Sequence, residues 1–147
     1  MSGVWKNLNA VRLPRPVVDE LMRQTQASPQ EEICGLMSRD RHGYWRCYPV
    51  PNRATDRKHF FTLDPKTQID AMRAMREHGE ELAAIYHSHP DSPAFPSPAD
   101  VAQHEYPDVL YFVISLNPHD KPALRGFRIH GQTVEEIVIE TEEDARR

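Results

Sequence analysis

The longest uninterrupted apolar run of this 147-residue chain, Val109–Ile114, has six residues. A membrane-spanning helix needs about 20 consecutive apolar residues, so no segment of the sequence predicts one. A short apolar run bounded by polar residues is instead typical of a strand that is buried on both faces of a sheet. We therefore predict that residues 109–115 form a central strand, around which the rest of the chain is arranged.

Three segments carry the signals of helices. Val17–Gln26 has apolar residues at helical spacing and follows two prolines. Asp64-Pro65 places a capping residue before a proline at the first helical position, and this helix is expected to close at Gly79. A shorter helix is expected to begin at Ser97-Pro98 and to run to about residue 105.

Short apolar segments between these helices predict further strands, some of which are close enough in sequence to form hairpins. Because helices and strands are mixed and several strands are adjacent, we predict the α+β class, with one mixed sheet flanked by helices. The length predicts a single domain over residues 1–147, with a core from about 11 to 139 and a frayed tail from residue 141. The expected strands are 33–37, 44–50, 60–63, 82–86, 109–115, 124–130 and 133–139.

The formal net charge of −4 is unevenly spread. Six of the 22 acidic residues follow Val134, and the body before them carries equal numbers of acidic and basic residues. Phosphate binding needs a net basic face, so nucleic acid is not expected as a partner, and neither is a membrane. We interpret the cluster of Arg53, Arg57 and Lys58 as a solvated loop. Residues 1–7 lack the layout of a signal peptide, which predicts a cytoplasmic protein.

Eight histidines stand against two cysteines, so a metal site would have to use histidine and carboxylate ligands rather than cysteine alone. His87-Ser88-His89 follows the predicted strand 82–86. Residues two apart in an extended chain point to the same face, so both imidazoles could bind one metal ion while Ser88 faces away. Taken alone, this pattern is more typical of two surface histidines.

The sequence after the histidines adds candidates for the same site. Ser97 and Asp100 match a helix capping box, which accounts for both without a metal. A rigid helix start also suits a ligand, and Asp100 as a third ligand would leave a fourth position for water, as in catalytic zinc sites. Such a site needs a general base, and Glu32 is the candidate, although an acid at a strand entrance is commonly just solvated.

Two segments carry a family resemblance. His87-Ser88-His89-Pro90 with Ser97 and Asp100 resembles the JAMM motif of the MPN-domain metalloproteases, and Glu32-Ile33-Cys34-Gly35 is similar to the E-x-C-G segment of the short bacterial members. The resemblance covers residues 11–139. It implies the cytidine-deaminase-like MPN/JAMM fold and a Zn²⁺ ion bound by His87, His89 and Asp100. It also implies that Glu32 takes a proton from water and passes it to the leaving amine, while Ser97 donates a hydrogen bond to the oxyanion.

Other residues compete for these roles. His104 follows Asp100 by four positions and could replace a ligand if the helix continues that far. Cys34 could act as a nucleophile, but its apolar neighbours favour a packed thiol. No role is assigned to the remaining five histidines, which are His42, His59, His78, His119 and His130.

The resemblance also implies a reaction. It indicates a zinc peptidase or isopeptidase that hydrolyses an amide bond after the Gly-Gly tail of a small ubiquitin-like sulfur-carrier protein, and so either trims the carrier tail or releases an amino acid such as cysteine from it. Such a tail could bind as an added strand at a sheet edge. The alternatives are a non-catalytic MPN-type scaffold and a JAMM peptidase associated with phage tails or cell walls. Family members often pair, which makes a homodimer a further expectation.

Overall fold

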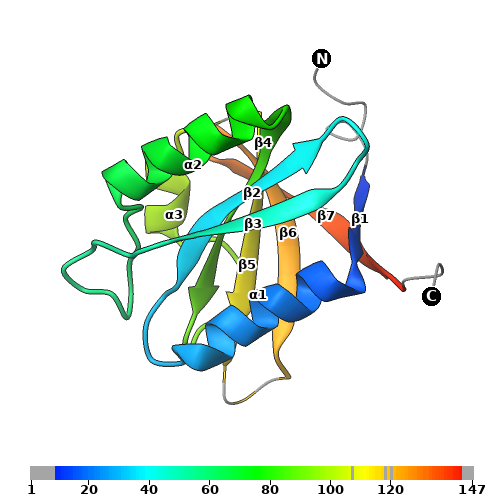
Figure 1. Cartoon of the computed structure of the whole chain (residues 1–147). Coiled ribbons are helices and arrows are strands. Elements are labelled where there is room, and N and C mark those ends of the chain that lie inside the picture. The colour runs from blue at the N-terminus through cyan, green and yellow to red at the C-terminus, as the bar shows by residue number, and fades with distance from the viewer. Residues whose placement is uncertain (1–8, 107, 118, 120, 144–147) are drawn as a thin grey trace.

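The computed structural model describes residues 9–106, 108–117, 119 and 121–143. Within these residues no helix is long and apolar enough to cross a membrane. The described part contains three helices and seven strands, with the helices interspersed among the strands (Figure 1). In chain order they are β1 (Ala10–Pro14), α1 (Arg15–Ala27), β2 (Cys34–Asp40), β3 (Trp45–Val50), α2 (Pro65–Glu77), β4 (Glu80–His89), α3 (Pro98–Gln103), β5 (Leu110–Ser115), β6 (Ala123–His130) and β7 (Thr133–Glu142).

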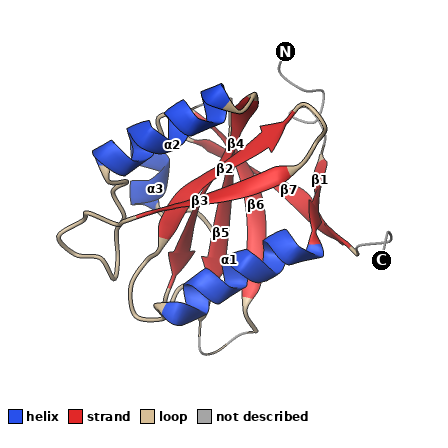
Figure 2. Cartoon of the chain, in the orientation of Figure 1, coloured by secondary structure: helices blue, strands red, loops and turns tan. Residues whose placement is uncertain are grey.

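The strands form one mixed sheet with the order β1-β7-β6-β5-β4-β2-β3 (Figure 2). The apolar strand β5 lies in the middle of this order, as its composition predicts. It pairs in parallel with β4 and antiparallel with β6. Strands that are close in sequence form hairpins, as expected: β2 pairs antiparallel with β3, and β6 with β7. The prediction of a single mixed sheet is therefore confirmed.

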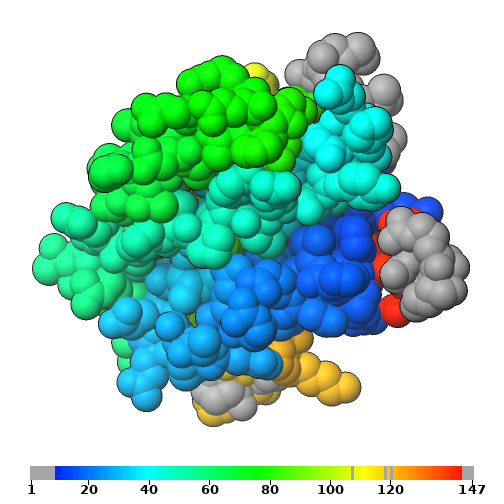
Figure 3. Space-filling view, viewed as in Figure 1, coloured from blue at the N-terminus to red at the C-terminus, as the bar shows by residue number. Residues whose placement is uncertain are grey.

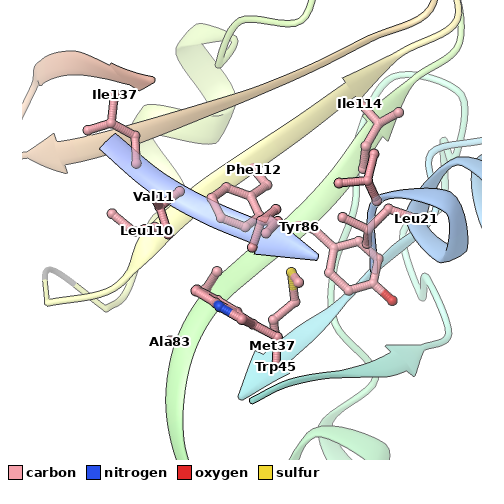
Figure 4. Close-up of a cluster of buried hydrophobic side chains, with 13 residues drawn as sticks. Val11, Leu21, Met37, Trp45, Ala83, Tyr86, Leu110, Phe112, Ile114 and Ile137 are labelled. Atoms are coloured by element: carbon pink, nitrogen blue, oxygen red, sulfur yellow. The ribbon is translucent and has the colours of Figure 1, made fainter. Parts of the chain in front are cut away.

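Helices cover both faces of the sheet, and adjacent residues of the central strands point to opposite faces. Tyr86 and Phe112 pack with Leu21 of α1 on one face (Figure 4). Ile85 and Tyr111 pack with Met75 of α2 on the other face. In the space-filling view, α1, the β2–β3 hairpin and α2 hide the central strands (Figure 3). Since His87 and His89 have the same parity as Ile85 along β4, they belong to the face that α2 covers.

The helix starts follow the predicted capping chemistry. Asp64 accepts a hydrogen bond from the Thr67 amide at 3.0 Å, and Pro65 is the first residue of α2. Ser97 and Asp100 form a reciprocal capping box at the start of α3. This short helix ends at Gln103, two residues before the predicted end, and His104 has extended backbone angles. The helix therefore does not carry His104 on the face of Asp100.

The strand predicted at residues 60–63 is wrong. The segment makes only one isolated bridge, between Asn52 and Leu63. The side chain of Asn52 takes the place of a neighbouring strand: its Oδ1 accepts from the Thr62 amide at 3.0 Å, and its Nδ2 donates to the Phe60 carbonyl at 2.9 Å. Sequence periodicity cannot reveal a segment whose backbone is satisfied in this way.

Other differences lie at the ends of strands. β2 continues to Asp40, three residues beyond the end of the strand predicted at 33–37. β1 was not predicted; it pairs in parallel with β7 and buries Val11 and Leu13. This pairing extends β7 to Glu142, into the tail expected to fray from residue 141. Residues 1–8 and 144–147 lie outside the described residues, and so do the predictions for the start of the chain and for the end of its tail.

Candidate metal centre

Four of the residues singled out in the sequence converge at the end of β4. Glu32, His87, His89 and Asp100 each offer one ligand atom, and these atoms all lie within 4.8 Å of one another. Glu32 precedes β2, the histidines end β4, and Asp100 lies in the first turn of α3. Glu32, His87 and His89 are buried, and Asp100 is half-buried. Three separate segments thus bring the predicted metal ligands and the predicted base into one cluster.

The spacing of the ligand atoms fits a metal ion. The Nε2 atoms of His87 and His89 are 3.2 Å apart, and Oδ2 of Asp100 lies 2.9 Å from the first and 3.3 Å from the second. In a tetrahedral site with metal–ligand bonds of about 2.0–2.1 Å, the ligand atoms are roughly 3.3 Å apart. The three side chains therefore already have the mutual distances that one ion requires.

The hydrogen bonds of His89 leave its inner nitrogen free to bind. Its Nδ1 donates to the carbonyl oxygen of Pro93 at 2.8 Å, so Nε2 is the nitrogen with the free lone pair. Pro93 belongs to the proline-rich loop between β4 and α3, which gives this stiff loop a part in orienting the ring. On the other side of the cluster, the ring of Phe61 stacks on His87 with 4.4 Å between the ring centroids.

Asp100 is fixed by the capping box. Its Oδ2 accepts from the Ser97 amide at 2.8 Å, and its own amide donates to Ser97 Oγ at 3.0 Å. Burial opposes ionisation of this carboxyl, but the contacts of its Oδ2 with the His87 and His89 rings outweigh burial and hold the pKa of Asp100 well below its ordinary value. The charged Asp100 side chain thus both caps α3 and contacts the two histidines. Ser97 lies beside Asp100 and is half-buried.

Glu32 has the environment of a proton-transfer group. It is only 4 % exposed, and its Oε1 has no hydrogen-bond partner among the described residues. Burial raises the pKa of Glu32 to about 8, although the nearby His89 acts in the opposite direction. A buried carboxyl with a pKa near neutrality can both accept and donate a proton at physiological pH.

The donor set of the cluster fits a metal ion. Glu32 Oε1 is a buried carboxylate oxygen without a partner within the described part of the chain. Such atoms are costly unless a structural or chemical role compensates. Two imidazole nitrogens and a carboxylate oxygen at ligand distances, with an unpartnered carboxyl beside them, are a donor set into which a divalent metal fits.

Ser88 is a residue of the site that the sequence did not reveal. It faces away from the predicted metal ligands, as expected, but its Oγ accepts from the Ile33 amide at 2.8 Å. The Ser88 amide in turn donates to the Ile33 carbonyl at 3.0 Å. Ile33 is the residue after Glu32, so the serine between the two histidines ties their strand to the segment of the predicted base. A small polar residue between two predicted ligands in a buried strand is the signal that could have found it.

The rest of the E-x-C-G segment has structural explanations. A Cβ atom at Gly35 would lie 2.4 Å from the ring of Tyr86, so only glycine fits there. The thiol of Cys34 donates to the Val50 carbonyl at 3.3 Å, and burial raises the pKa of Cys34 to about 12. A thiol with this pKa is not an activated nucleophile, which confirms the interpretation of Cys34 as a packed residue.

His104 and the basic residues of the loop lie outside the cluster of ligand atoms. His104 interacts through Nδ1 with the Val101 carbonyl of its own helix. Arg53, Arg57 and Lys58 are at least half exposed and form ion pairs, with Asp64, Glu31 and Asp91 respectively. This agrees with the interpretation of the basic cluster as a solvated loop.

Two cavities border the cluster, and the sequence predicted neither. One of about 580 Å³ lies between α2 and α3 and is lined by His87 and Asp100 together with apolar side chains such as Phe61 and Tyr111. The other, of about 610 Å³, is bordered by Glu32 and Asn52. The cluster therefore lies beside spaces that can admit parts of a substrate.

Known proteins are similar to this chain in sequence. Residues 14–130 match the family model Prok-JAB, described as prokaryotic homologs of the JAB domain. A "Probable TtuB-protein conjugate cleaving protease" of Thermus thermophilus is 33% identical over 128 residues, which are 86% of this chain and 82% of that protein. The CysO-cysteine peptidase of Mycobacterium tuberculosis is 29% identical over 124 residues, which are 83% of this chain and 85% of that protein.

A third relative is matched over a shorter stretch. The desampylase of Haloferax volcanii is 29% identical over 89 residues, which are 59% of this chain. The matched part spans 64% of the desampylase, a little less than two thirds of its length.

Solved structures have the same fold. A protein of Desulfitobacterium hafniense superposes with a TM-score of 0.77 at 34% identity, over 90% of this chain and 93% of that chain. A JAB1/MPN domain protein of Archaeoglobus fulgidus superposes with a TM-score of 0.59 at 14% identity, over 90% of this chain and 98% of that chain. The predicted MPN/JAMM fold is therefore confirmed. With a family model that matches most of its length, the chain belongs to the prokaryotic homologs of the JAB domain, a family of JAMM-type metallopeptidases.

Proposed function

We propose that the protein is a zinc-dependent peptidase or isopeptidase that hydrolyses the amide bond after the Gly-Gly tail of a small ubiquitin-like sulfur-carrier protein, with cysteine as one possible leaving group. The observation that carries this proposal is the convergence of Glu32 with His87, His89 and Asp100 within 4.8 Å. A cytoplasmic location and a homodimer belong to the same proposal as expectations.

The proposed metal ligands are His87, His89 and Asp100. Two imidazoles and one carboxylate, with a fourth position open, are the donor set of catalytic zinc sites, whereas structural zinc sites are closed by four protein ligands. When bound, zinc polarises the scissile carbonyl and lowers the pKa of a water molecule. The capping box orients Asp100 and the Pro93 carbonyl orients His89 before a metal ion binds.

Glu32 and Ser97 are the proposed catalytic side chains. Glu32 takes a proton from the attacking water and passes it to the leaving amine, a role for which a raised pKa near 8 is suited. Ser97 Oγ accepts a hydrogen bond from the Asp100 amide, which leaves the hydroxyl hydrogen to donate. We propose that it donates to the oxyanion that develops on the scissile carbonyl, where a fixed donor has its largest effect.

The substrate class is supported by the relatives and by the shape of the site. Two relatives, of which this chain covers 82% and 85%, are named for cleaving TtuB–protein conjugates and CysO–cysteine. A Gly-Gly tail has no side chains, which suits it to the cavity lined by His87 and Asp100. The scaffold alternative gives no reason for a buried carboxyl at Glu32 whose Oε1 has no partner among the described residues, because such an atom is costly without a chemical role.

The test is a cleavage assay with defined substrates. The zinc-loaded protein is incubated with a sulfur-carrier protein whose C-terminal glycine carries cysteine, and with the same carrier joined to a lysine side chain, and the products are identified by mass spectrometry. We expect free carrier from at least one substrate and none after zinc is removed by a chelator. Failure to bind zinc after reloading would favour the scaffold. Zinc binding without cleavage of either conjugate would overturn the proposed substrate.

A further inference from the structure

Asn52 uses the whole hydrogen-bonding capacity of its side chain. Its Nδ2 donates to the carbonyl oxygens of Glu32 and Phe60, both at 2.9 Å. Its Oδ1 accepts from the amides of Ala54 at 2.9 Å and Thr62 at 3.0 Å. A carboxamide offers two donor hydrogens and two acceptor lone pairs, and here all four are used. Asn52 is therefore a junction between the segment of the proposed base and the loop 53–62.

The loop 53–62 is closed at its base and touches Glu32 from a second side. The Arg53 amide donates to the Thr62 carbonyl at 2.8 Å, which brings the two ends of the loop together. The Glu32 amide donates to the Arg57 carbonyl at 2.7 Å. Both backbone polar groups of Glu32 are thus bonded to Asn52 or to the loop that Asn52 holds.

The same loop carries a ring onto a proposed metal ligand. Phe61 lies between Phe60 and Thr62, the two residues whose backbone groups bond to Asn52. Its ring stacks on His87 at 4.4 Å and also lines the cavity of about 580 Å³. One half-buried junction therefore connects the backbone of the proposed base to the aromatic ring that packs on His87.

We propose that Asn52 is a positioning residue for hydrolysis, which holds Glu32 and the Phe61 ring in fixed positions relative to His87 and His89. Asn52 is not placed among the catalytic residues, since it acts on the base through the Glu32 carbonyl. The effect on activity rests on the proposed function, whereas the effect on the loop does not. Displacement of a catalytic group by about 1 Å can lower a rate by about 100-fold, so a loosened junction has a measurable consequence.

Asn52→Asp tests the two donor bonds of the Asn52 side chain separately from its two acceptor bonds. Aspartate has nearly the same shape and keeps the oxygen that accepts from the Ala54 and Thr62 amides. It replaces the donor group by a carboxylate oxygen facing the carbonyls of Glu32 and Phe60, and therefore loses these two bonds. Asn9→Asp is the matched control: Asn9 is exposed beside β1, at the edge of the sheet far from β4 in strand order.

Two readouts are measured on the zinc-loaded protein. Amide hydrogen exchange of residues 29–34 and 53–62 reports the junction itself, and we expect it to be at least about tenfold faster in Asn52→Asp than in the wild type and in Asn9→Asp. Steady-state kinetics with a carrier conjugate report the consequence: we expect kcat to fall about 10- to 100-fold, KM to change less than about threefold, and the zinc content to stay the same.

Several results would overturn the proposal. Unchanged exchange and unchanged kcat in Asn52→Asp would show that the junction positions nothing, and a loss of zinc or a rise in KM alone would assign Asn52 a different role. If Asn52→Asp does not fold, Asn52→Ser is measured instead, because serine can still accept from the Ala54 amide. If the wild type cleaves no conjugate, the proposed function fails, and exchange alone then decides whether Asn52 holds Glu32.

Discussion

His87, His89 and Asp100 owe their positions to local structure, whereas Glu32 owes its position to distant parts of the chain. Strand alternation in β4 places the two histidines on one face, and a capping box fixes Asp100. Glu32 is held by the loop 53–62 and, through its neighbour Ile33, by β4. A proposed ligand set can thus be specified by short motifs, while the proposed base depends on tertiary contacts that can loosen independently.

The largest expected effect comes from removing a ligand. His89→Ala deletes a ring whose Nε2 lies 3.2 Å from that of His87, so we expect both zinc and measurable hydrolysis to be lost. Metal analysis of the purified variant, together with a cleavage assay, checks this. Zinc retained at the wild-type ratio would remove His89 from the proposed ligand set.

Ser97→Ala tests a residue with two proposed roles, capping of α3 and stabilisation of the oxyanion. Loss of the cap is expected to lower the free energy of unfolding by about 1 kcal/mol, and loss of the oxyanion donor to lower kcat by about 100- to 1,000-fold. Ser97→Asp can still cap the helix but cannot donate, so it should keep the stability and lose the activity. Wild-type kcat in Ser97→Asp would assign Ser97 to capping alone.

Ser88→Ala removes the hydrogen bond between β4, which carries the two histidines, and Ile33, the residue after Glu32. The variant leaves the Ile33 amide without its side-chain acceptor, and a buried donor without a partner costs about 1–3 kcal/mol. We expect kcat to fall about tenfold while the zinc content is unchanged, because the ligands remain in place. Equal kcat in the variant and the wild type, measured well below both unfolding temperatures, would show that this tie does not position the base.

A last expected effect, on stability alone, is a pH dependence of the metal-free protein. Burial raises the pKa of Glu32 from 4.5 to about 8. Between these values the native state keeps a proton that the unfolded state releases, so stability should fall as the pH rises. Glu32 contributes at most about 1.4 kcal/mol per pH unit to the slope of the free energy of unfolding against pH. Urea unfolding of the wild type and Glu32→Gln over this range isolates the contribution; parallel curves would contradict it.

The same contrast explains which features the sequence could predict. Helix caps at Asp64 and Ser97, the apolar strand β5 and the spacing of His87 and His89 are local patterns, and the structure contains all of them. It also brings Glu32 into the same cluster, which only the family resemblance had suggested with any specificity.

What the sequence could not predict depends on partners far away in the chain. β1 is a strand only because β7 lies beside it, and residues 60–63 are not a strand because the Asn52 side chain satisfies their backbone. Ser88 and Asn52 look ordinary in the sequence, because their importance comes from bonds to the backbone around Glu32.

The most direct test of a metal centre with a separate base is Glu32→Gln, measured for zinc content and hydrolysis in the same preparation. Glutamine keeps the shape of the side chain but cannot take up the proton. The account predicts one zinc ion bound as in the wild type and a kcat lowered by on the order of 100- to 10,000-fold. Full activity of a homogeneous Glu32→Gln protein would contradict the account.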